Sequence, residues 1–300
     1  MTDDATRTLN DALSEAAAAV NTALGDLLPR PTAHHGRVQE AMAYAVFVGG
    51  KRLRPFLVLE GARLFGVPRD RALRAAAAIE MLHTYSLVHD DLPCMDDDDL
   101  RRGQPTTHKK FDEASAVLAG DGLLTFAFEV LADPATHPSG EVRCQLVSLL
   151  AKAGGSDGMI GGQMMDIVAS EHDFGSDEII RLQQMKTGAL FEFSCEAGAI
   201  LGEAKADDRQ RMRAYARDFG LAFQISDDLI DVTSTAEMAG KAVGKDQDMG
   251  KATLVTLLGV DGARTEALRL AQQAADGLAP YGPEADVLRA LPFMLIDRQT

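Results

Sequence analysis

An acidic run that follows directly on an apolar helical pattern most constrains how this chain can fold. Apolar residues at helical spacing lead to paired carboxylates at Asp90 and Asp91, and four consecutive aspartates follow at 96–99. Pro93 cannot continue a helix, so the chain breaks there and can return Asp96 toward Asp90. So many like charges destabilise a compact fold unless positive charge neutralises them. The run is therefore either a solvated surface loop or one wall of a pocket that binds cations.

A second carboxylate cluster favours the pocket. Asp227 and Asp231 are four residues apart and share one face of a helix, with Asp228 beside them, again inside an apolar helical pattern. Because both clusters lie in segments expected to pack, they can face each other across one cavity. Carboxylate oxygens bind hard cations, and Mg²⁺ is the ion we expect there.

Composition favours one all-α unit over the 300 residues of the chain. Alanine and leucine dominate, aromatic residues make up only 5%, and alternating Val/Ile-rich runs of the strand type do not occur. A hydrophobic content of 46% is enough for a large core. No linker or repeat marks a second domain, so we expect residues 1–300 to form a single domain.

Charge and cysteine content limit the partners and the compartment. The net charge of −15 argues against nucleic acid, whose phosphates require a basic surface. Cys94, Cys144 and Cys195 are scattered and odd in number, which fits a reducing cytoplasm better than a disulfide framework. The N-terminus does not resemble a secretory signal, and we find no uninterrupted apolar run near the roughly 18 residues that span a bilayer. We expect a cytoplasmic protein with no membrane partner.

Apolar periodicity, with proline and glycine as boundaries, predicts a series of helices. Ser176 is a candidate N-cap for one of them, and the Lys186-Thr187-Gly188 segment within that helix is expected to kink it and free a carbonyl. A polar loop of some twenty residues, 233–253, follows the second aspartate cluster. The predicted helices cover about 4–27, 36–48, 55–64, 69–92, 113–132, 140–153, 177–202, 206–232, 252–259, 262–277 and 283–296.

Clusters of cations interrupt this acidic chain at two places. GGKRLRP (49–55) carries Lys51, Arg52 and Arg54 at a junction between helices. They either offset a helix dipole on the surface or clamp a diphosphate, since arginine's planar fork suits phosphate oxygens. The 233–253 loop holds three lysines, which are Lys241, Lys245 and Lys251.

The residues that precede the first aspartates are candidates for a cavity wall. Ser86 lies one turn before Asp90 on the same helix face, and Tyr85 lies beside it. If Asp90 holds a metal at the mouth of a cavity, both side chains line the wall about 6–8 Å deeper, by the helical rise. Tyr85 is otherwise an ordinary core tyrosine.

A substrate with a diphosphate head and an apolar body fits this set of residues. Mg²⁺ bridges carboxylate and phosphate oxygens, so ions on both clusters would make the diphosphate a good leaving group. Its departure leaves a carbocation, so the cavity must exclude water and offer fixed dipoles. A carbonyl at Lys186 or Thr187 and the amide of Gln224 are candidates. The cations of GGKRLRP can then hold a second diphosphate, whose alkene attacks.

These motifs together resemble those of the trans-prenyl diphosphate synthases. HDDLPCMDDDDLRRGQPT resembles the family's first aspartate-rich motif, in the longer form with two residues inserted between the aspartates, and FQISDDLID resembles the second. GGKRLRP, GGQMMD, KTG and the GK…GK loop occur in the family's order, so the resemblance covers essentially the whole chain. The paired aspartate motifs are specific, and the chain is similar in particular to the bacterial farnesyl diphosphate synthases.

The resemblance implies a fold, a reaction and a set of roles. The fold is a single antiparallel bundle of about ten or more helices around a central cavity, usually a homodimer. The reaction joins dimethylallyl or geranyl diphosphate to isopentenyl diphosphate, and the released diphosphate takes the final proton. A cluster of about three Mg²⁺ ions is expected with substrate bound. The implied ligands of these ions are Asp90, Asp91, Asp96, Asp227, Asp228 and Asp231.

The resemblance also implies roles for cationic and polar residues. The residues implied to contact the allylic diphosphate are Arg101, Lys186, Lys241 and Lys251, with Thr187 and Gln224 facing the developing cation. The residues implied to hold isopentenyl diphosphate are Lys51, Arg54, His83 and Arg102. The C-terminus, DRQT, departs from relatives with a basic tail, because it offers only Arg298.

The sequence leaves alternatives for the length of the product and for the class of enzyme. The family uses side chains just before the first motif as a floor for the growing chain, so bulky Tyr85, with Ser86, implies a farnesyl product, whereas the longer first motif also occurs in geranylgeranyl diphosphate synthases. A terpene cyclase should replace DDLID with an Asn/Ser/Glu triad. A non-catalytic partner subunit should have lost an aspartate motif. An HD-type phosphohydrolase can use His89-Asp90, but the further histidine ligands it needs cannot be placed.

Overall fold

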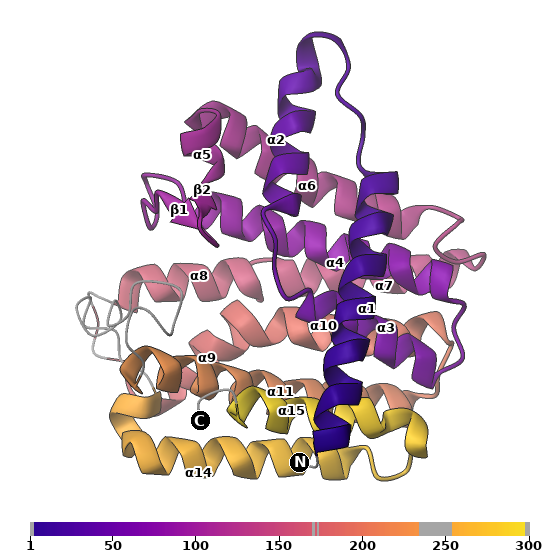
Figure 1. Cartoon of the computed structure of the whole chain (residues 1–300), viewed down its shortest axis with the longest axis vertical. Coiled ribbons are helices and arrows are strands. Elements are labelled where there is room, and N and C mark those ends of the chain that lie inside the picture. Colours follow the sequence, from indigo (N-terminus) through magenta and orange to yellow (C-terminus); the bar gives the residue numbers. More distant parts are fainter. Residues whose placement is uncertain (1–2, 170–171, 173, 234–253, 298–300) are drawn as a thin grey trace.

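The structure is a computed structural model that describes residues 3–169, 172, 174–233 and 254–297 and is almost entirely helical there (Figure 1). The α-helices are α1 (Asp3–Leu27), α2 (Gly36–Phe47), α3 (Leu53–Leu64), α4 (Arg69–Asp90), α5 (Thr107–Lys110), α6 (Glu113–Ala132), α7 (Gly140–Gly154), α8 (Met159–Val168), α9 (Ser176–Gln183), α10 (Ala189–Leu201), α11 (Ala206–Thr233), α14 (Leu254–Gly277) and α15 (Asp286–Asp297). Short 3₁₀ turns, η1 (Ala33–His35) and η4 (Pro283–Ala285), and a π-helical turn, η3 (Gln184–Gly188), complete the helical elements. The expectation of an all-α fold is confirmed.

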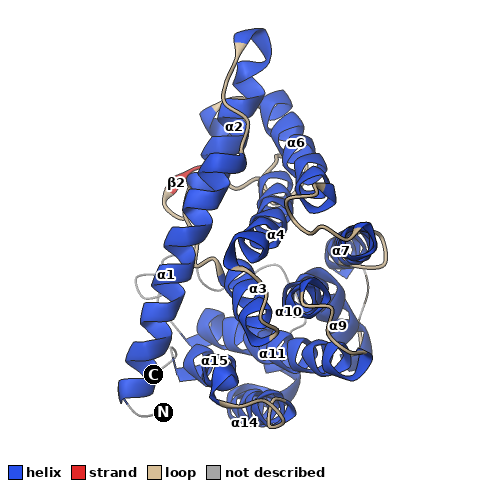
Figure 2. Ribbon diagram, turned by 90° about the vertical axis from the view of Figure 1, so that its right-hand side faces the viewer, coloured by secondary structure: helices blue, strands red, loops and turns tan. Residues whose placement is uncertain are grey.

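Helix α4 lies in the interior of the bundle and carries the first aspartate motif at its C-terminal end. It packs against α3, α6 and α10, and α10 in turn packs against α11. Five consecutive residues of α4, 75–79, are fully buried, as expected of a helix that is covered on all sides. Figure 2 shows α1 along one edge of the molecule, with α7, α10, α11 and α14 seen nearly end-on.

The observed helix ends follow the predicted ones closely. The kink predicted at Lys186-Thr187-Gly188 is the π-helical turn η3, which joins α9 to α10. The two helices predicted over 252–277 form α14, which is kinked at Gly259, where φ is +70°. The predicted N-cap was wrong: Gly175 occupies that position, and its N–H donates to the Glu178 carboxylate at 2.9 Å.

A small hairpin after the acidic run is the one element with strands in the described ranges. Strand β1 (Leu100–Arg101) pairs antiparallel with β2 (Gln104–Pro105) through a two-residue turn. Both turn residues, Arg102 and Gly103, have positive φ, as type I′ turns require. The hairpin turns the chain back toward the end of α4.

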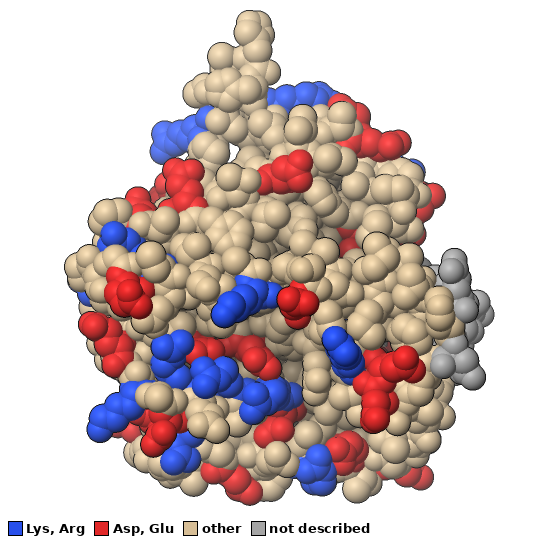
Figure 3. Space-filling view, turned by 180° about the vertical axis from the view of Figure 1, so that it is seen from behind, with Lys and Arg blue, Asp and Glu red and all other residues tan. Residues whose placement is uncertain are grey.

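Two surface properties bear on the predicted partners. Helix α6 is long and apolar enough to cross a membrane by length and composition, although Asp121 and Glu129 interrupt its apolar residues. It packs against α2, α4 and α7, so it serves here as a helix of the bundle. On the face shown in Figure 3, acidic and basic side chains are interspersed.

Candidate active site

The break predicted at Pro93 places Asp96 next to Asp90. Helix α4 ends at Asp90, and the loop that follows turns so that the Asp96 N–H donates to the Asp90 carbonyl oxygen at 2.9 Å. This bond spans six residues, a separation at which a regular helix would place the two side chains on different faces. The proline therefore supplies the geometry that the spacing of the carboxylates requires.

Asp90 lies in an environment that disfavours its negative charge. Burial raises the pKa of Asp90 to about 6; Lys186 and Arg101 oppose this rise, and the charges of Asp96 and Asp91 add to it. A divalent cation at this carboxylate would reverse the balance, because an opposite charge favours the ionised form. The local electrostatics thus fit a metal ligand.

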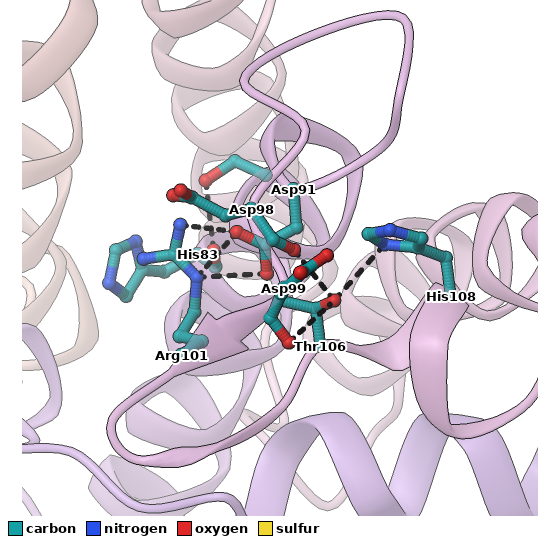
Figure 4. Close-up of polar contacts among 8 residues, drawn as sticks. His83, Asp91, Asp98, Asp99, Arg101, Thr106 and His108 are labelled. Atoms are coloured by element: carbon teal, nitrogen blue, oxygen red, sulfur yellow. Dashed lines mark hydrogen bonds and ion pairs between the residues drawn. The ribbon is translucent and has the colours of Figure 1, made fainter.

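Asp91 has a different environment and bonds Arg101. The Asp91 side chain is buried and accepts hydrogen bonds from two nitrogens of Arg101: Nε, which lies 2.8 and 2.9 Å from the two carboxylate oxygens, and Nη2, which lies 2.5 Å from Oδ1 (Figure 4). Such planar pairs are strong and directional. Arg101, which the resemblance places on the allylic diphosphate, is therefore fixed on the motif by Asp91, which supports the site through this pair.

A cavity of about 440 Å³ opens beside Asp90. Tyr85 and Ser86 line it together with Asp90, as the helical spacing predicts, and Lys186 and Thr187 line it from η3. Tyr85 is nearly buried and packs edge-to-face on the His89 ring. Helix α8 contributes four apolar residues to the wall, which are Met159, Ile160, Met164 and Ile167, and further apolar residues come from α4, from the loop after it and from α10. The cavity is thus lined by apolar side chains together with the polar groups of Asp90, Lys186 and Thr187.

A second cavity of about 620 Å³ adjoins the first. It collects all four residues predicted to hold isopentenyl diphosphate, which are Lys51, Arg54, His83 and Arg102. Residues from the second motif region also line it, namely Gln224 and Asp227. Arg54, His83 and Thr187 line both cavities, so the cationic cluster and the two aspartate motifs surround one continuous region.

Arg54 and His83 present a polar edge to both cavities. The Arg54 guanidinium lies 4.6 Å from the Phe191 ring centroid, and its Nε is buried and has no hydrogen-bond partner among the described residues. Burial lowers the pKa of Arg54 to about 10, so it stays cationic near neutral pH. Burial and the charges of Arg54 and Arg102 hold the pKa of His83 well below its ordinary value, so His83 is neutral there. Arg54 Nη1 lies 3.4 Å from His83 Nε2, and an anion beside the guanidinium would satisfy the orphaned Nε donor of Arg54.

Sequence reasoning missed the structural role of Arg52 in GGKRLRP. Its guanidinium is buried and donates to Glu80 at 2.5 Å, to the Val46 carbonyl at 2.6 Å and to Asn21 at 3.0 Å. The pair ties the loop between α2 and α3 to α4. A lone acid inside the apolar segment AAAAIEML was the available signal, because a buried carboxylate requires a partner.

The second motif is held by amides. Gln224 donates to Asp228 at 2.9 Å and accepts from the Thr187 hydroxyl at 3.2 Å, and Gln183 also donates to Asp228 at 3.3 Å. Asp228 and Asp231 are buried, while Asp227 is half-buried and lines the second cavity. Asp227 is thus the carboxylate of this motif placed toward the shared region.

Of the three lysines predicted to contact the allylic diphosphate, Lys186 is the one that the structure describes. Lys186 bonds Asp166 of GGQMMD, with Nζ at 2.6 Å from the carboxylate, and both side chains are partly buried. This ion pair fixes the position from which Lys186 reaches the first cavity. Lys241 and Lys251, together with Arg298, lie outside the described residues.

The carboxylates suit a divalent metal without forming a closed site in advance. Over residues 3–169, 172, 174–233 and 254–297, no three His, Cys, Asp or Glu side chains are grouped closely enough to hold an ion. Oxygen donors from Asp90, Asp96 and Asp227 fit a hard cation that keeps part of its coordination for water or phosphate oxygens. The residues present therefore fit Mg²⁺ shared with a bound diphosphate.

Close packing of α8 on η3 gives a first prediction. A Cβ built on Gly162 would lie 2.2 Å from the Lys186 amide nitrogen and 2.6 Å from its Cα. Gly162→Ala is expected to lower the free energy of unfolding by about 1–3 kcal/mol and to reduce turnover, because backbone must move next to Lys186 and Thr187. Gly277→Ala, where the new Cβ meets nothing within 4 Å, is the matched control. Urea unfolding and a turnover assay check both; equal effects would contradict the packing role.

The helical bundle, with two aspartate motifs bordering adjoining cavities, defines the class of isoprenoid synthases. The chain belongs to the polyprenyl synthetase family, whose model matches residues 35–277. It is 45% identical to a farnesyl diphosphate synthase of Geobacillus stearothermophilus over 255 residues (84% of this chain, 85% of the relative). It is 44% identical to a chloroplastic geranylgeranyl pyrophosphate synthase of Catharanthus roseus over 268 residues (88% and 74%). The solved structure of an FPP/GFPP synthase from Zymomonas mobilis matches with a TM-score of 0.89 at 48% identity, covering 97% of this chain and 99% of that one.

Proposed function

We propose that this chain is a Mg²⁺-dependent prenyltransferase that joins geranyl diphosphate to isopentenyl diphosphate and releases farnesyl diphosphate and pyrophosphate. Starting from dimethylallyl diphosphate, a first condensation of the same kind gives geranyl diphosphate and a second gives farnesyl diphosphate. One observation carries the proposal: a largely apolar cavity lined by Asp90 adjoins a cavity lined by Asp227 and by Lys51, Arg54 and Arg102, and Arg54, His83 and Thr187 line both. Two diphosphate substrates can thereby meet at one place. Membership of the polyprenyl synthetase family supports the same reaction.

The first cavity orients the allylic substrate. Its apolar wall holds the hydrocarbon, and Lys186, which lines the cavity and interacts with Asp90, stabilises negative charge on the departing diphosphate. Bound Mg²⁺ would act as a Lewis acid on that diphosphate. As the carbon–oxygen bond breaks, positive charge develops on the allylic carbon, and the oxygens of Thr187 and Gln224 lie where the two cavities adjoin.

The second cavity orients the acceptor. Lys51, Arg54 and Arg102 supply positive charge for the diphosphate of isopentenyl diphosphate, and neutral His83 supplies one N–H. Its alkene attacks the allylic carbon, a carbon–carbon bond forms, and loss of a proton restores a double bond. The displaced diphosphate takes that proton, so the reaction needs no further reactant.

The proposal also includes the number of metal ions, the oligomeric state and the compartment. We infer a cluster of about three Mg²⁺ ions held by Asp90, Asp96 and Asp227, because a diphosphate between two carboxylate groups needs several bridging charges. We also infer a single catalytic domain that works as a homodimer in the cytoplasm. Gel filtration with light scattering tests the dimer; a monomeric mass at assay concentration would remove it.

Farnesyl as the product rests on Tyr85. Its ring lies in the wall of the first cavity, five residues before Asp90, where it limits the space for a longer chain. Relatives with geranylgeranyl products share similar identity, so overall similarity does not decide the length. The floor formed by Tyr85 favours fifteen carbons.

Tyr85→Ala is therefore expected to shift the main product beyond fifteen carbons, because the truncation extends the cavity along the hydrocarbon. Tyr85→Phe, which keeps the ring, is expected to retain farnesyl. Chromatography of dephosphorylated products from isopentenyl and geranyl diphosphates measures both. An unchanged product from the alanine variant would exclude Tyr85 as the floor.

One assay separates the proposal from its rivals. Purified protein with Mg²⁺, isopentenyl diphosphate and geranyl diphosphate should give a chain-extended diphosphate. Cyclised hydrocarbon would indicate a cyclase, free phosphate a hydrolase, and no product a binding subunit; each of these outcomes overturns the proposal. The hydrolase is disfavoured, because His89 is directed to the Val117 carbonyl of α6, with its Nε2 3.1 Å away.

A further inference from the structure

Thr106 and His108 form a buried polar network where the acidic loop joins the hairpin. Both side chains are buried, and neither lines the two substrate cavities. The Thr106 hydroxyl donates to the Asp98 carbonyl at 2.8 Å, and the Thr106 N–H donates to the Asp99 carbonyl at 3.0 Å (Figure 4). The end of the acidic loop is thus fixed at two carbonyls by a single residue.

The direction of these hydrogen bonds follows from the hydrogens available. The hydroxyl of Thr106 has one hydrogen, which it gives to Asp98. His108 Nδ1 lies 3.2 Å from the same hydroxyl oxygen, so the ring must donate through an Nδ1–H. His108 Nε2 is buried without a partner among the described residues, so Nδ1 is the ring nitrogen that makes the hydrogen bond. The network therefore runs from His108 through Thr106 to Asp98.

Asp96 lies at the other end of the loop, where the Asp97 N–H donates to the Leu92 carbonyl at 3.1 Å. Asp96 is held beside Asp90 by one backbone hydrogen bond, and the next residue, Asp97, adopts a φ of +49°. Left-handed backbone at a residue other than glycine costs energy and persists only where its surroundings fix it. The hairpin that closes the loop is fastened to α4 through Arg101, and to α2 through Tyr44, whose hydroxyl donates to the Pro105 carbonyl at 2.6 Å. Thr106 completes these restraints.

We propose that the Thr106 hydroxyl, oriented by His108, is a positioning group that keeps Asp96 beside Asp90 so that both carboxylates reach one divalent cation. This inference rests on the proposed metal role of Asp90 and Asp96. It assigns no contact between Thr106 and substrate or metal. Its effect is on the affinity for the cation and on the order of the loop.

Binding of Mn²⁺ in the presence of inorganic pyrophosphate, followed by electron paramagnetic resonance, tests the inference. Thr106→Val keeps the shape and removes the donor, and we expect about a tenfold weaker Mn²⁺ affinity, the effect of about one hydrogen bond. Thr106→Ser should bind like wild type. The matched control is Thr107→Val, which should be unchanged, since Thr107 is also buried but its hydroxyl makes no hydrogen bond with the part of the chain that the structure describes.

Variants of His108 and amide exchange separate positioning from general destabilisation. His108→Asn retains a donor near the Nδ1 position and should bind Mn²⁺ like wild type, whereas His108→Leu should resemble Thr106→Val. Without metal, Thr106→Val should speed exchange of the Asp96 amide about tenfold, with α4 and α6 unchanged. Turnover should recover at saturating Mg²⁺.

The outcomes are distinct. Wild-type protein that fails to bind Mn²⁺ with pyrophosphate overturns the proposed function, and this inference with it. If the wild-type protein binds Mn²⁺ and Thr106→Val binds it with the same affinity, the inference alone is overturned. Equal weakening in Thr106→Val and Thr107→Val, or faster exchange throughout the chain, also overturns it, because the effect would then be one of general stability.

Discussion

Asp90→Asn is expected to lower kcat by about a thousandfold or more while the fold is retained. The substitution keeps the size of the side chain and removes the charge that would hold a divalent cation. The free energy of unfolding should stay unchanged or rise at pH 7. Burial raises the pKa of Asp90 from 3.8 to about 6. Ionisation of Asp90 therefore lowers the free energy of unfolding; this loss grows as the pH rises between these two values and is complete above about 6. Asparagine carries no charge and removes the loss.

The control for this prediction is another aspartate of the same run. Asp97 is exposed and has left-handed backbone, which asparagine tolerates well, so Asp97→Asn should change neither stability nor kcat appreciably. Steady-state rates at saturating substrate and Mg²⁺, together with urea unfolding, measure both variants. A near-wild-type rate for Asp90→Asn would remove Asp90 from the metal site.

The second large effect is expected at the buried ion pair between Arg52 and Glu80. Glu80→Gln leaves the guanidinium of Arg52 inside the protein without its counter-charge, and breaking a pair of this kind costs about 3–5 kcal/mol. The loss should extend to the second cavity, because the charge of Glu80 also acts on Arg54 and Arg102. We expect a lower free energy of unfolding and a higher KM for isopentenyl diphosphate.

Matched substitutions define this effect. Glu266→Gln breaks a partly exposed pair with Arg269 and should cost no more than about 1 kcal/mol. Replacing Arg52 and Glu80 together by methionine should restore much of the stability, since no charge then stays buried. Urea unfolding of the three variants decides the matter. Equal losses of unfolding free energy in Glu80→Gln and Glu266→Gln would contradict a stabilising role for the buried pair at the loop between α2 and α3.

Local sequence rules predicted most of the helices, because each rule acts within a few residues. Apolar periodicity and glycine or proline boundaries placed helices such as α4 and α6 to within a few residues. Pro93 predicted the turn that brings Asp96 to Asp90, and Lys186-Thr187-Gly188 predicted the irregular turn η3. The grouping of Lys51, Arg54, His83 and Arg102 came from the resemblance, and one cavity collects all four.

These local rules do not predict contacts between residues that are far apart in the sequence. Strands of two residues each carry almost no periodicity, so the hairpin that delivers Arg101 to Asp91 had no usable pattern. The partners of Arg52 and Lys186, which are Glu80 and Asp166, are far away in sequence and are fixed only by how the helices pack. Pairing of charges depends on the three-dimensional arrangement, whereas helix ends depend on neighbours.

The central claim is that Asp90 and Asp96 on one side, and Asp227 on the other, bind divalent ions around a single diphosphate head. A crystal structure of the protein with Mn²⁺ and an unreactive allylic diphosphate analogue, with ions located by anomalous scattering, tests it most directly. We predict ions bonded to both aspartate motifs and to oxygens of one diphosphate group. A diphosphate bound with ions on only one motif, or with Asp227 directed away from it, would contradict the claim.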